Sequence, residues 1–332
     1  MVIERHIRGA RVLVTGAAGF IGSNLVEDLL LHDNEVVGLD SLATGHRSNI
    51  ESFLDDKRFN FIEGDIRDLD ACKKAADGVD YVLHQAALGS VPRSIDDPIL
   101  TNEVNVGGFL NMLVAARDAK VKRFIYATSS SVYGDDQRLP KVEGKTGRPL
   151  SPYAVTKSVN ENYARVFGEL YGMETIGLRY FNVFGKNQDP DGPYAAAIPK
   201  FIRHLIRHES PTVHGDGTQS RDFTYVKNVV HANHIAAIST NPVAVNDVYN
   251  IAYGESTNLN ELISILQDLL SDFDSKIADV EVKYGPERVG DVRHSLALAV
   301  KANTVLGYRP EYDLKKGLEE AIEWYWAFLG GK

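Results

Sequence analysis

Tyr153 and Lys157 stand four positions apart in the run Tyr-Ala-Val-Thr-Lys. In a helix this spacing places both side chains on one face. An ammonium beside a phenol stabilises the phenolate and lowers the tyrosine pKa from its usual value of about 10. Such a tyrosine can serve as an acid or base toward a substrate hydroxyl at neutral pH. Ser129 ends an expected strand upstream, and its hydroxyl can hold the same oxygen. For the Tyr-x-x-x-Lys pair alone, an ordinary helix face is the alternative interpretation.

A glycine-rich turn near the start of the chain gives this pair a context. Gly16, Gly19 and Gly22 lie between an expected strand at 11–15 and an expected helix at 20–31. Glycines in this position permit a tight turn, a close approach of the backbone to a pyrophosphate, and close packing of helix on strand. The free N–H groups and the dipole of the helix N-terminus favour an anion there. The pattern predicts a dinucleotide site, with a structural turn as the alternative.

Polar side chains follow the next expected strands. Asp40 directly follows 35–39, where a carboxylate accepts hydrogen bonds from the adenosine ribose hydroxyls and repels a 2′-phosphate. The predicted cofactor is therefore NAD rather than NADP. Asp65 and Gln85 follow the third and fourth expected strands, at the carboxyl ends where open α/β sheets bind ligands. A solvated aspartate and a hydrogen-bonded structural glutamine are the alternatives at these two positions.

Short apolar runs alternate with helical segments through the first half of the chain. This alternation predicts an α/β fold, a Rossmann-type doubly wound parallel sheet. After about residue 182 the alternation loosens, which predicts a smaller interleaved α/β C-terminal lobe for the substrate. We expect a NAD-binding domain at 1–182, to which some later segments return, and a second lobe at 183–332. The expected strands are 11–15, 35–39, 59–62, 81–83, 124–127 and 175–180, then 212–214, 223–225, 247–250 and 280–283. The expected helices are 20–31, 69–77, 97–118, 152–171, 195–207, 259–271 and 314–328.

Composition excludes several classes of function. The 332 residues carry 36 Lys plus Arg against 45 Asp plus Glu, a net charge of −9, which argues against nucleic-acid and anionic-membrane binding. The single cysteine, Cys72, excludes an intrachain disulfide and a multi-thiolate zinc site. No long apolar span and no signal-peptide core are visible, which predicts a cytoplasmic protein. The pairs His204/His208 and His231/His234 lack a third ligand nearby, so we expect no metal site.

Further ordered stretches carry a resemblance to a known family. The chain resembles the extended short-chain dehydrogenases/reductases that act on nucleotide sugars. Among these it is most similar to the UDP-hexose 4-epimerases, and in particular to the branch that handles N-acetylated sugars in surface-polysaccharide synthesis. The resemblance runs from Thr15 to about Pro310. The matching stretches are 84–87, 89–94, 129–134, 151–153, 178–185, 220–223 and 290–295.

The resemblance implies roles for individual residues. Ser129, Tyr153 and Lys157 match the catalytic serine, tyrosine and lysine, and the last two also match cofactor contacts. The other positions that match cofactor contacts are Gly16, Gly19, Phe20, Ile21, Asp40, Asp65, Ile66, Gln85, Asn105 and Val183. The positions that match contacts to the UDP-sugar are Ser90, Asn182, Ala196, Ala197, Lys200, Val213, Arg221, Arg288 and Asp291. Guanidinium groups suit the diphosphate because their fork pairs with phosphate oxygens.

The resemblance also implies a mechanism. Tyr153, as the phenolate, takes the proton from the sugar O4 while hydride leaves C4 for NAD⁺. The 4-keto sugar then rotates in the pocket, and hydride returns to its opposite face. NAD is recycled in place, so the protein supplies orientation and electrostatics and needs no external reductant.

Three serines bear on the reaction and on the sugar. Related dehydratases place an acidic residue directly after the catalytic serine or threonine, whereas Ser130 and Ser131 stand here, which argues against 4,6-dehydration. Ser295 stands where some UDP-galactose 4-epimerases carry a bulky tyrosine, so a 2-acetamido group has room to rotate, and Ser130 and Ser131 can offer it hydroxyls. We expect a preference for UDP-GlcNAc and UDP-GalNAc, with action on the uronic acid forms or on UDP-Glc and UDP-Gal left open. A loop serine without a gating role is the alternative for Ser295.

Two other functions remain as alternatives. One is a UDP-uronate epimerase or decarboxylase on the same scaffold, and the other is a non-catalytic NAD-binding module. Relatives commonly dimerise through two long helices per subunit, and the matching segments here are 97–118 and 152–171. The resemblance therefore implies a homodimer held by a four-helix bundle.

Overall fold

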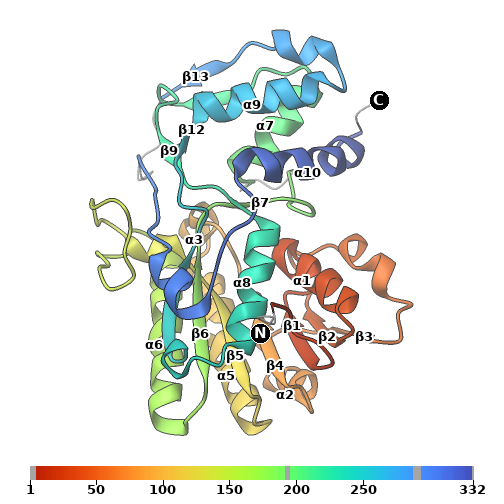
Figure 1. Cartoon of the computed structure of the whole chain (residues 1–332), viewed down its shortest axis with the longest axis vertical. Coiled ribbons are helices and arrows are strands. Elements are labelled where there is room, and N and C mark those ends of the chain that lie inside the picture. The colour runs from red at the N-terminus through yellow and green to blue at the C-terminus, as the bar shows by residue number, and fades with distance from the viewer. Residues whose placement is uncertain (1–4, 191–194, 287–292, 331–332) are drawn as a thin grey trace.

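The computed structural model describes residues 5–190, 195–286 and 293–330. Within these ranges the largest sheet has seven parallel strands in the order β11-β6-β5-β4-β1-β2-β3 (Figure 1). The strands are β1 (Arg11–Thr15), β2 (Glu35–Asp40), β3 (Phe59–Glu63), β4 (Tyr81–His84), β5 (Arg123–Ser129), β6 (Thr175–Tyr180) and β11 (Asp247–Ile251). The strand order reverses at β1, and open α/β sheets bind ligands beside such a reversal. The expected doubly wound fold is confirmed.

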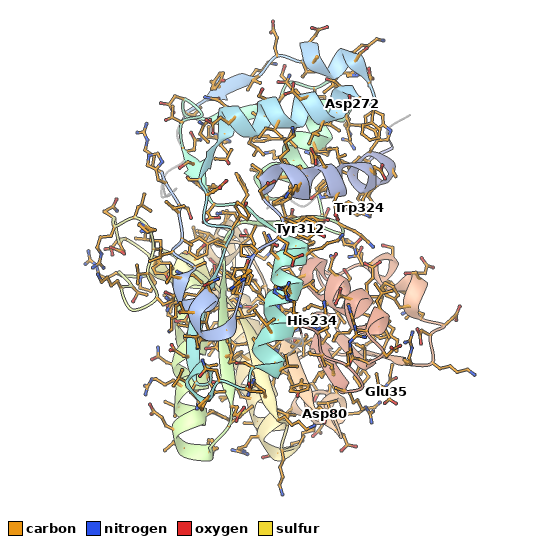
Figure 2. The ribbon with its side chains drawn as sticks, viewed as in Figure 1. Glu35, Asp80, His234, Asp272, Tyr312 and Trp324 are labelled. Carbon is orange, nitrogen blue, oxygen red and sulfur yellow. The ribbon has the colours of Figure 1, made fainter. Side chains whose placement is uncertain are left out.

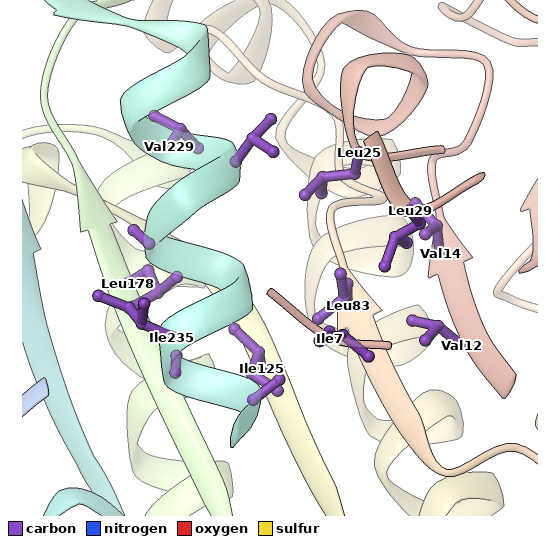
Figure 3. Close-up of a cluster of buried hydrophobic side chains, with 14 of the residues drawn as sticks. Ile7, Val12, Val14, Leu25, Leu29, Leu83, Ile125, Leu178, Val229 and Ile235 are labelled. Carbon is purple, nitrogen blue, oxygen red and sulfur yellow. The ribbon is translucent and has the colours of Figure 1, made fainter. Parts of the chain in front are cut away.

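Helices cover both faces of this sheet. The α-helices of the described ranges are α1 (Phe20–Leu31), α2 (Leu69–Ala76), α3 (Val91–Asp96), α4 (Pro98–Asn102), α5 (Phe109–Asp118), α6 (Pro152–Tyr171), α7 (Ala197–Ile206), α8 (Val226–Ile238), α9 (Leu259–Ser271) and α10 (Leu314–Phe328). One buried cluster joins α1 and α8 to the sheet, and another joins α2, α5 and α6 to it. Figure 3 shows the first cluster, to which α1 contributes Leu25 and Leu29 and α8 contributes Val229 and Ile235.

The helix expected at 97–118 is present as one helical segment from Pro98 to Asp118, with a π-helical turn inside it. α4 ends at Asn102, Glu103–Gly108 forms a π-helical turn, and α5 begins only at Phe109. At Gly108 a Cβ would lie 2.5 Å from the Cγ1 of Ile66, so the chain passes this side chain at a distance that only glycine allows. Short π-helical turns within helices are frequent at functional sites, and Ile66 lines the cavity described below.

Segments from beyond residue 182 join the main sheet. β11 pairs with β6, and α8 packs against α1, β5 and β6. The sequence did not predict α8, because a helix buried on nearly all sides lacks the alternation of apolar and polar faces that signals an amphipathic helix. Even Asn228, Asn233 and His234 of α8 are buried.

The second lobe lies at the carboxyl ends of the main strands and is built on α7, α9 and α10, at the top of Figure 1. Its short strand pairs are β7 (Val183–Phe184) with β10 (Thr224–Tyr225), β9 (Ser220–Arg221) with β12 (Thr257–Asn258), and β8 (Thr212–His214) with β13 (Lys283–Gly285). The strand expected at 280–283 is displaced to β13, because its parallel pairing with β8 begins at Lys283. Among the described residues, none of the helices combines the length and the apolar character needed to cross a membrane.

Candidate active site

The glycine-rich turn connects β1 to α1 as expected. Gly16 has φ +68, and a Cβ on it would lie 2.9 Å from the backbone nitrogen of Ala86. A Cβ on Gly22 would lie 1.9 Å from the carbonyl oxygen of Gly16, so the helix can start this close to the strand only with glycine at 22. Gly19 caps α1 without any side-chain hydrogen bond. The first N–H groups of α1 are thus left for an anion such as a pyrophosphate.

Asp40 is held rigidly at the end of β2. Its Oδ2 accepts a hydrogen bond from the backbone N–H of Ala18 at 2.9 Å, and its Oδ1 accepts one from Leu42 at 2.8 Å. The side chain lines the same cavity as the glycine turn. A fixed carboxylate at this place fits the adenosine ribose of NAD and disfavours the extra phosphate of NADP. The residues present therefore fit the dinucleotide.

A cavity of about 630 Å³ runs along the carboxyl ends of the strands. It brings together most of the predicted cofactor residues, which are Gly16, Gly19, Phe20, Ile21, Asp40, Asp65, Ile66, Gln85, Tyr153, Lys157 and Val183. Asn105 does not line it. Its buried side chain instead accepts from the N–H of Leu88 at 2.7 Å and donates to the Leu88 carbonyl at 3.1 Å. Asn105 thus steadies a backbone segment that forms the cavity wall.

Asp65 and Gln85 both have partners within the chain. The Arg67 guanidinium bonds the Asp65 carboxylate at 2.7 Å and holds its pKa below the usual value. Gln85 donates to Asn233 Oδ1 at 3.1 Å and accepts from the Tyr180 hydroxyl at 3.2 Å. Asn233 lies on α8, a helix without a sequence signal, so its support of this cavity-lining glutamine is not predictable from the sequence.

The Tyr-Lys pair lies at the start of α6 as predicted. The Ser151 hydroxyl caps the helix by accepting from the Ala154 N–H at 3.1 Å. The Lys157 ammonium donates to the carbonyl oxygen of Ala127 on β5 at 2.9 Å and lies 5.9 Å from the centre of the Tyr153 ring. Ser129 ends β5, and its side chain lowers the pKa of Tyr153. The three predicted catalytic side chains therefore meet in one place, and all three line the cavity.

The protonation behaviour of this trio differs in part from the expectation. Burial raises the pKa of Tyr153, and this effect outweighs the influence of the Ser129 hydroxyl, which lowers it. The expected net lowering of the tyrosine pKa is therefore wrong for the chain by itself. Burial also lowers the pKa of Lys157 to about 8, although the carboxylate of Glu161 acts in the opposite direction. Both shifts have the same cause, because burial disfavours the charged form of each group.

A second cavity, of about 270 Å³, continues the first into the upper lobe. Asn182, Val183 and Ala196 line both cavities, so the two lie next to each other. Of the predicted substrate residues, Ala197, Lys200 and Arg221 line the second cavity, and Ser90 lines the first. Val213 is fully buried in the core of the upper lobe and lines neither, although its neighbours Thr212 and His214 do.

Ser130, Ser131 and Ser295 line neither cavity. Ser130 begins the short 3-10 turn Ser130–Tyr133, and the N–H of Ser131 donates to the Ser129 hydroxyl at 3.1 Å. The buried Ser131 hydroxyl has no hydrogen-bond partner among the described residues. The N–H of Ser295 donates to the carbonyl of Ser220 at 3.0 Å, which places Ser295 beside β9. The predictions for Arg288 and Asp291 fall outside the described residues.

A group of histidines that sequence spacing did not reveal gathers between α1 and α8. Candidate ligand atoms of His6, Asp28 and His234 lie within 4.8 Å of one another (Figure 2 labels His234 on α8). The Nδ1 of His234 accepts the backbone N–H of Ile7 at 3.1 Å, which leaves the ring proton on Nε2, 2.8 Å from Asp28. A metal would need the lone pair that this proton occupies. The arrangement therefore favours a contact that secures the N-terminal segment.

Comparisons with known proteins agree with this geometry. The profile of the NAD dependent epimerase/dehydratase family matches residues 12–252. A putative UDP-glucose 4-epimerase of Methanocaldococcus jannaschii is 37% identical over 94% of this chain and 97% of its own. The UDP-glucose 4-epimerase of Mycolicibacterium smegmatis is 35% identical over 95% of this chain and 98% of its own.

Solved structures are equally similar. The UDP-N-acetylglucosamine 4-epimerase from Methanobrevibacter ruminantium, in complex with UDP-N-acetylmuramic acid, superposes with a TM-score of 0.90 at 39% identity, covering 97% of this chain and 100% of that one. The UDP-glucuronic acid 4-epimerase from Bacillus cereus, with UDP-glucuronic acid and NAD, gives 0.86 at 32%, covering 96% and 99%. The glycine turn, Asp40 and the family profile together make NAD the cofactor, and the chain belongs to the NAD dependent epimerase/dehydratase family.

Proposed function

We propose that this protein is a UDP-hexose 4-epimerase that prefers UDP-GlcNAc and UDP-GalNAc. The observation that carries the proposal is the meeting of Ser129, Tyr153 and Lys157 in the cavity that also holds the glycine turn. The relatives named as 4-epimerases cover nearly the whole chain and support the reaction. Both UDP-glucose and UDP-N-acetylglucosamine epimerases are among these relatives. The proposed sugar preference therefore rests on the side chains near the sugar.

The proposed chemistry assigns one role to each residue of the trio. Bound NAD supplies oxidation and reduction at the sugar C4. Tyr153 takes the proton from O4 and later returns it, while Ser129 orients the same oxygen. Lys157 places a positive charge near the phenol and favours its deprotonated form. Burial raises the pKa of Tyr153 in the chain alone. When oxidised NAD is bound, its positive charge would add to that of Lys157 in favouring the phenolate.

The proposal favours epimerisation over loss of water. The two residues that follow Ser129 are serines, so no carboxylate stands beside the reacting sugar at that point of the chain. A dTDP-glucose 4,6-dehydratase from Streptomyces venezuelae has the same fold, with a TM-score of 0.84 at 32% identity. The fold is therefore shared by both reactions, and the side chains around the sugar decide between them.

The sugar preference follows from room and hydrogen bonding. Ser295 is a small residue bonded to Ser220, which stands between the cavity-lining residues Gln219 and Arg221. The hydroxyl of Ser131 is buried without a hydrogen-bond partner among the described residues. A 2-acetamido group needs space to rotate and profits from a hydroxyl that bonds it. We expect the ratio of kcat/KM for UDP-GlcNAc over UDP-Glc to be moderate, because an apolar wall discriminates weakly against a smaller sugar.

The test is incubation of the purified protein with UDP-GlcNAc, UDP-Glc and UDP-GlcNAcA in separate reactions, without a hydride donor, followed by NMR of the products. The expected result is C4 epimers in each active reaction, fastest with UDP-GlcNAc. Faster conversion of UDP-Glc or of the uronic acid would overturn the preference. Loss of the carboxyl group or accumulation of a keto sugar would show that the protein catalyses a reaction other than epimerisation. If none of the three UDP-sugars reacts, the protein is better described as a non-catalytic NAD-binding module.

We also propose that two copies associate through two helical segments per chain, 98–118, which comprises α4, the π-helical turn and α5, and 152–171, which is α6. Large apolar side chains on these helices face solvent in the single chain, with Ile99 72%, Val155 48% and Leu170 70% exposed. Covering them in a four-helix bundle would bury apolar surface beside the helix that carries Tyr153 and Lys157.

A further inference from the structure

Glu161 lies on α6 one turn beyond Lys157, and its carboxylate is largely buried. Its Oε1 accepts a hydrogen bond from the hydroxyl of Thr128 at 2.7 Å and one from Arg179 Nε at 2.8 Å. Its Oε2 accepts from Arg179 Nη2 at 2.7 Å. The side chains of Glu161 and Arg179 are 14% and 4% exposed. A charged pair taken this far from water persists only where its geometry is good and its remaining bonds are satisfied.

We propose that Glu161 is a positioning residue of the active site: its carboxylate ties α6 to β5 and β6 and supplies the negative charge that faces Lys157. The inference rests on the proposed function, because it explains how the trio of that site is held and charged. It adds a residue that contacts neither the sugar nor the cofactor.

The bonds of Glu161 and Lys157 fix the position of α6 relative to β5. Thr128 directly precedes Ser129 on β5, and it is the register partner of Arg179 on β6. Lys157 bonds the carbonyl of Ala127, the residue before Thr128. Two successive turns of α6 are therefore fastened to two successive residues of β5. These bonds set the position of α6 along β5, and with it the position of Tyr153 relative to Ser129.

Arg179 keeps the carboxylate in place. Its Nη1 donates to the carbonyl of Glu143 at 2.9 Å, and its guanidinium lies 5.0 Å from the centre of the Tyr133 ring. These contacts anchor the guanidinium on the side away from Glu161. The bidentate pair then leaves the carboxylate one rotamer in which both oxygens are bonded.

The electrostatic part follows from the groups around Lys157. On α6 these groups are Tyr153 and Glu161. On β4, the charge of Lys157 contributes to lowering the pKa of the buried His84. On β6, Arg179 forms the ion pair with Glu161. Burial favours the neutral amine, and Glu161 is the neighbour whose charge opposes this effect. Removing that charge therefore lowers the pKa of Lys157 below its value of about 8.

The experiment compares Glu161→Gln with Glu174→Gln. Glu174 pairs with Arg123 at 2.6 Å, at the opposite ends of β5 and β6 from the active site, so its variant breaks the same kind of ion pair without approaching Lys157. The first readout is the pKa of Lys157 in the NAD-loaded protein, from NMR of ¹³Cε-labelled lysine assigned with Lys157→Arg. The second is the ratio of kcat at pH 9 to kcat at pH 7 with UDP-GlcNAc and with UDP-Glc.

We expect Glu161→Gln to lower the pKa of Lys157 by about one unit and the kcat ratio about five-fold, and Glu174→Gln to change neither. An unchanged pKa of Lys157 in Glu161→Gln would overturn the proposal. This measurement does not require turnover, so it can be made even if the wild-type protein converts no UDP-sugar. Such a lack of turnover would count only against the proposed function. If Glu161→Gln does not fold, Glu161→Gln combined with Arg179→Gln leaves no unpaired buried charge and is expected to show the same shift. An unshifted titration there would be equally decisive.

Discussion

The ammonium of Lys157 is bonded to the carbonyl oxygen of Ala127, 2.9 Å away, so a helix side chain is fastened to the strand that ends at Ser129. The same ammonium lies 5.9 Å from the centre of the Tyr153 ring. One side chain thus links the strand that carries the serine to the helix turn that carries the tyrosine. Displacement of α6 along β5 would change the tyrosine, the serine and the positive charge together.

Replacing Tyr153 by phenylalanine removes the proposed acid and base while keeping the ring. We expect kcat to fall by about 10²- to 10⁴-fold, the range typical of a positioned proton-transfer group. Bound NAD, measured by chromatography of the cofactor released on denaturation, should stay at the wild-type level. Tyr171→Phe, on the same helix with its side chain half exposed, is the matched control and should keep full activity. Near-normal turnover by Tyr153→Phe would refute the assigned role.

Lys157 should make stability depend on pH. Its pKa is about 8 in the folded protein against 10.5 for the ordinary side chain, so between these values the unfolded chain holds more protons at this residue. The free energy of unfolding therefore gains from Lys157 as pH rises from about 8 to about 10, by about 3 kcal/mol at most. We expect wild type to gain stability relative to Lys157→Met over this range in urea titrations. Lys315→Met, at an exposed position, should run parallel to wild type.

Asp40 should decide between the two dinucleotides. Asp40→Asn keeps the shape and removes the charge that faces the ribose. We expect NAD to bind about ten-fold more weakly, as for loss of one charge-assisted hydrogen bond, and NADP to bind more tightly than it does to wild type. Calorimetric titration of the cofactor-free protein measures both constants. Asp33→Asn, whose side chain is 83% exposed, serves as control, and unchanged selectivity in Asp40→Asn would disprove the assignment.

Ser295 tests the proposed sugar preference. A tyrosine at this position would fill the space assigned to the 2-acetamido group. We expect Ser295→Tyr to lose about ten-fold or more of its kcat/KM on UDP-GlcNAc and to keep most of it on UDP-Glc, while Ser295→Ala retains both. An equal loss on the two sugars would show that this position does not gate the pocket.

The association of two chains can be measured directly. Light scattering at working concentration should give twice the chain mass of 36.6 kDa. Ile99→Glu places a charge on the exposed apolar face of α4 and should shift the protein to monomers, whereas Val243→Glu, on an exposed apolar side chain beyond α8, should not. A monomeric wild-type protein would contradict the proposed four-helix bundle.

Local patterns were sufficient for much of the fold and of the trio. β1, α1, α6, β6 and α10 lie at the predicted residues, because each has a period or a boundary signal within its own length. The spacing of Tyr153 and Lys157 is likewise a property of one helix turn, and Gly16, Gly19 and Gly22 all lie in the short stretch where β1 leads into α1. These features depend on neighbours a few residues away, so the sequence by itself determined them.

Contacts between distant segments needed the tertiary structure. α8 is buried on most sides and has no amphipathic pattern, and the π-helical turn at Glu103–Gly108 exists where the chain must pass Ile66 closely. The pKa of Tyr153 is raised because burial, which packing creates, outweighs the influence of Ser129 from the neighbouring strand β5. The bonds from Glu161 to Thr128 and Arg179 join three elements. Such properties depend on which surfaces meet and on how completely they exclude water, and only the assembled fold decides both.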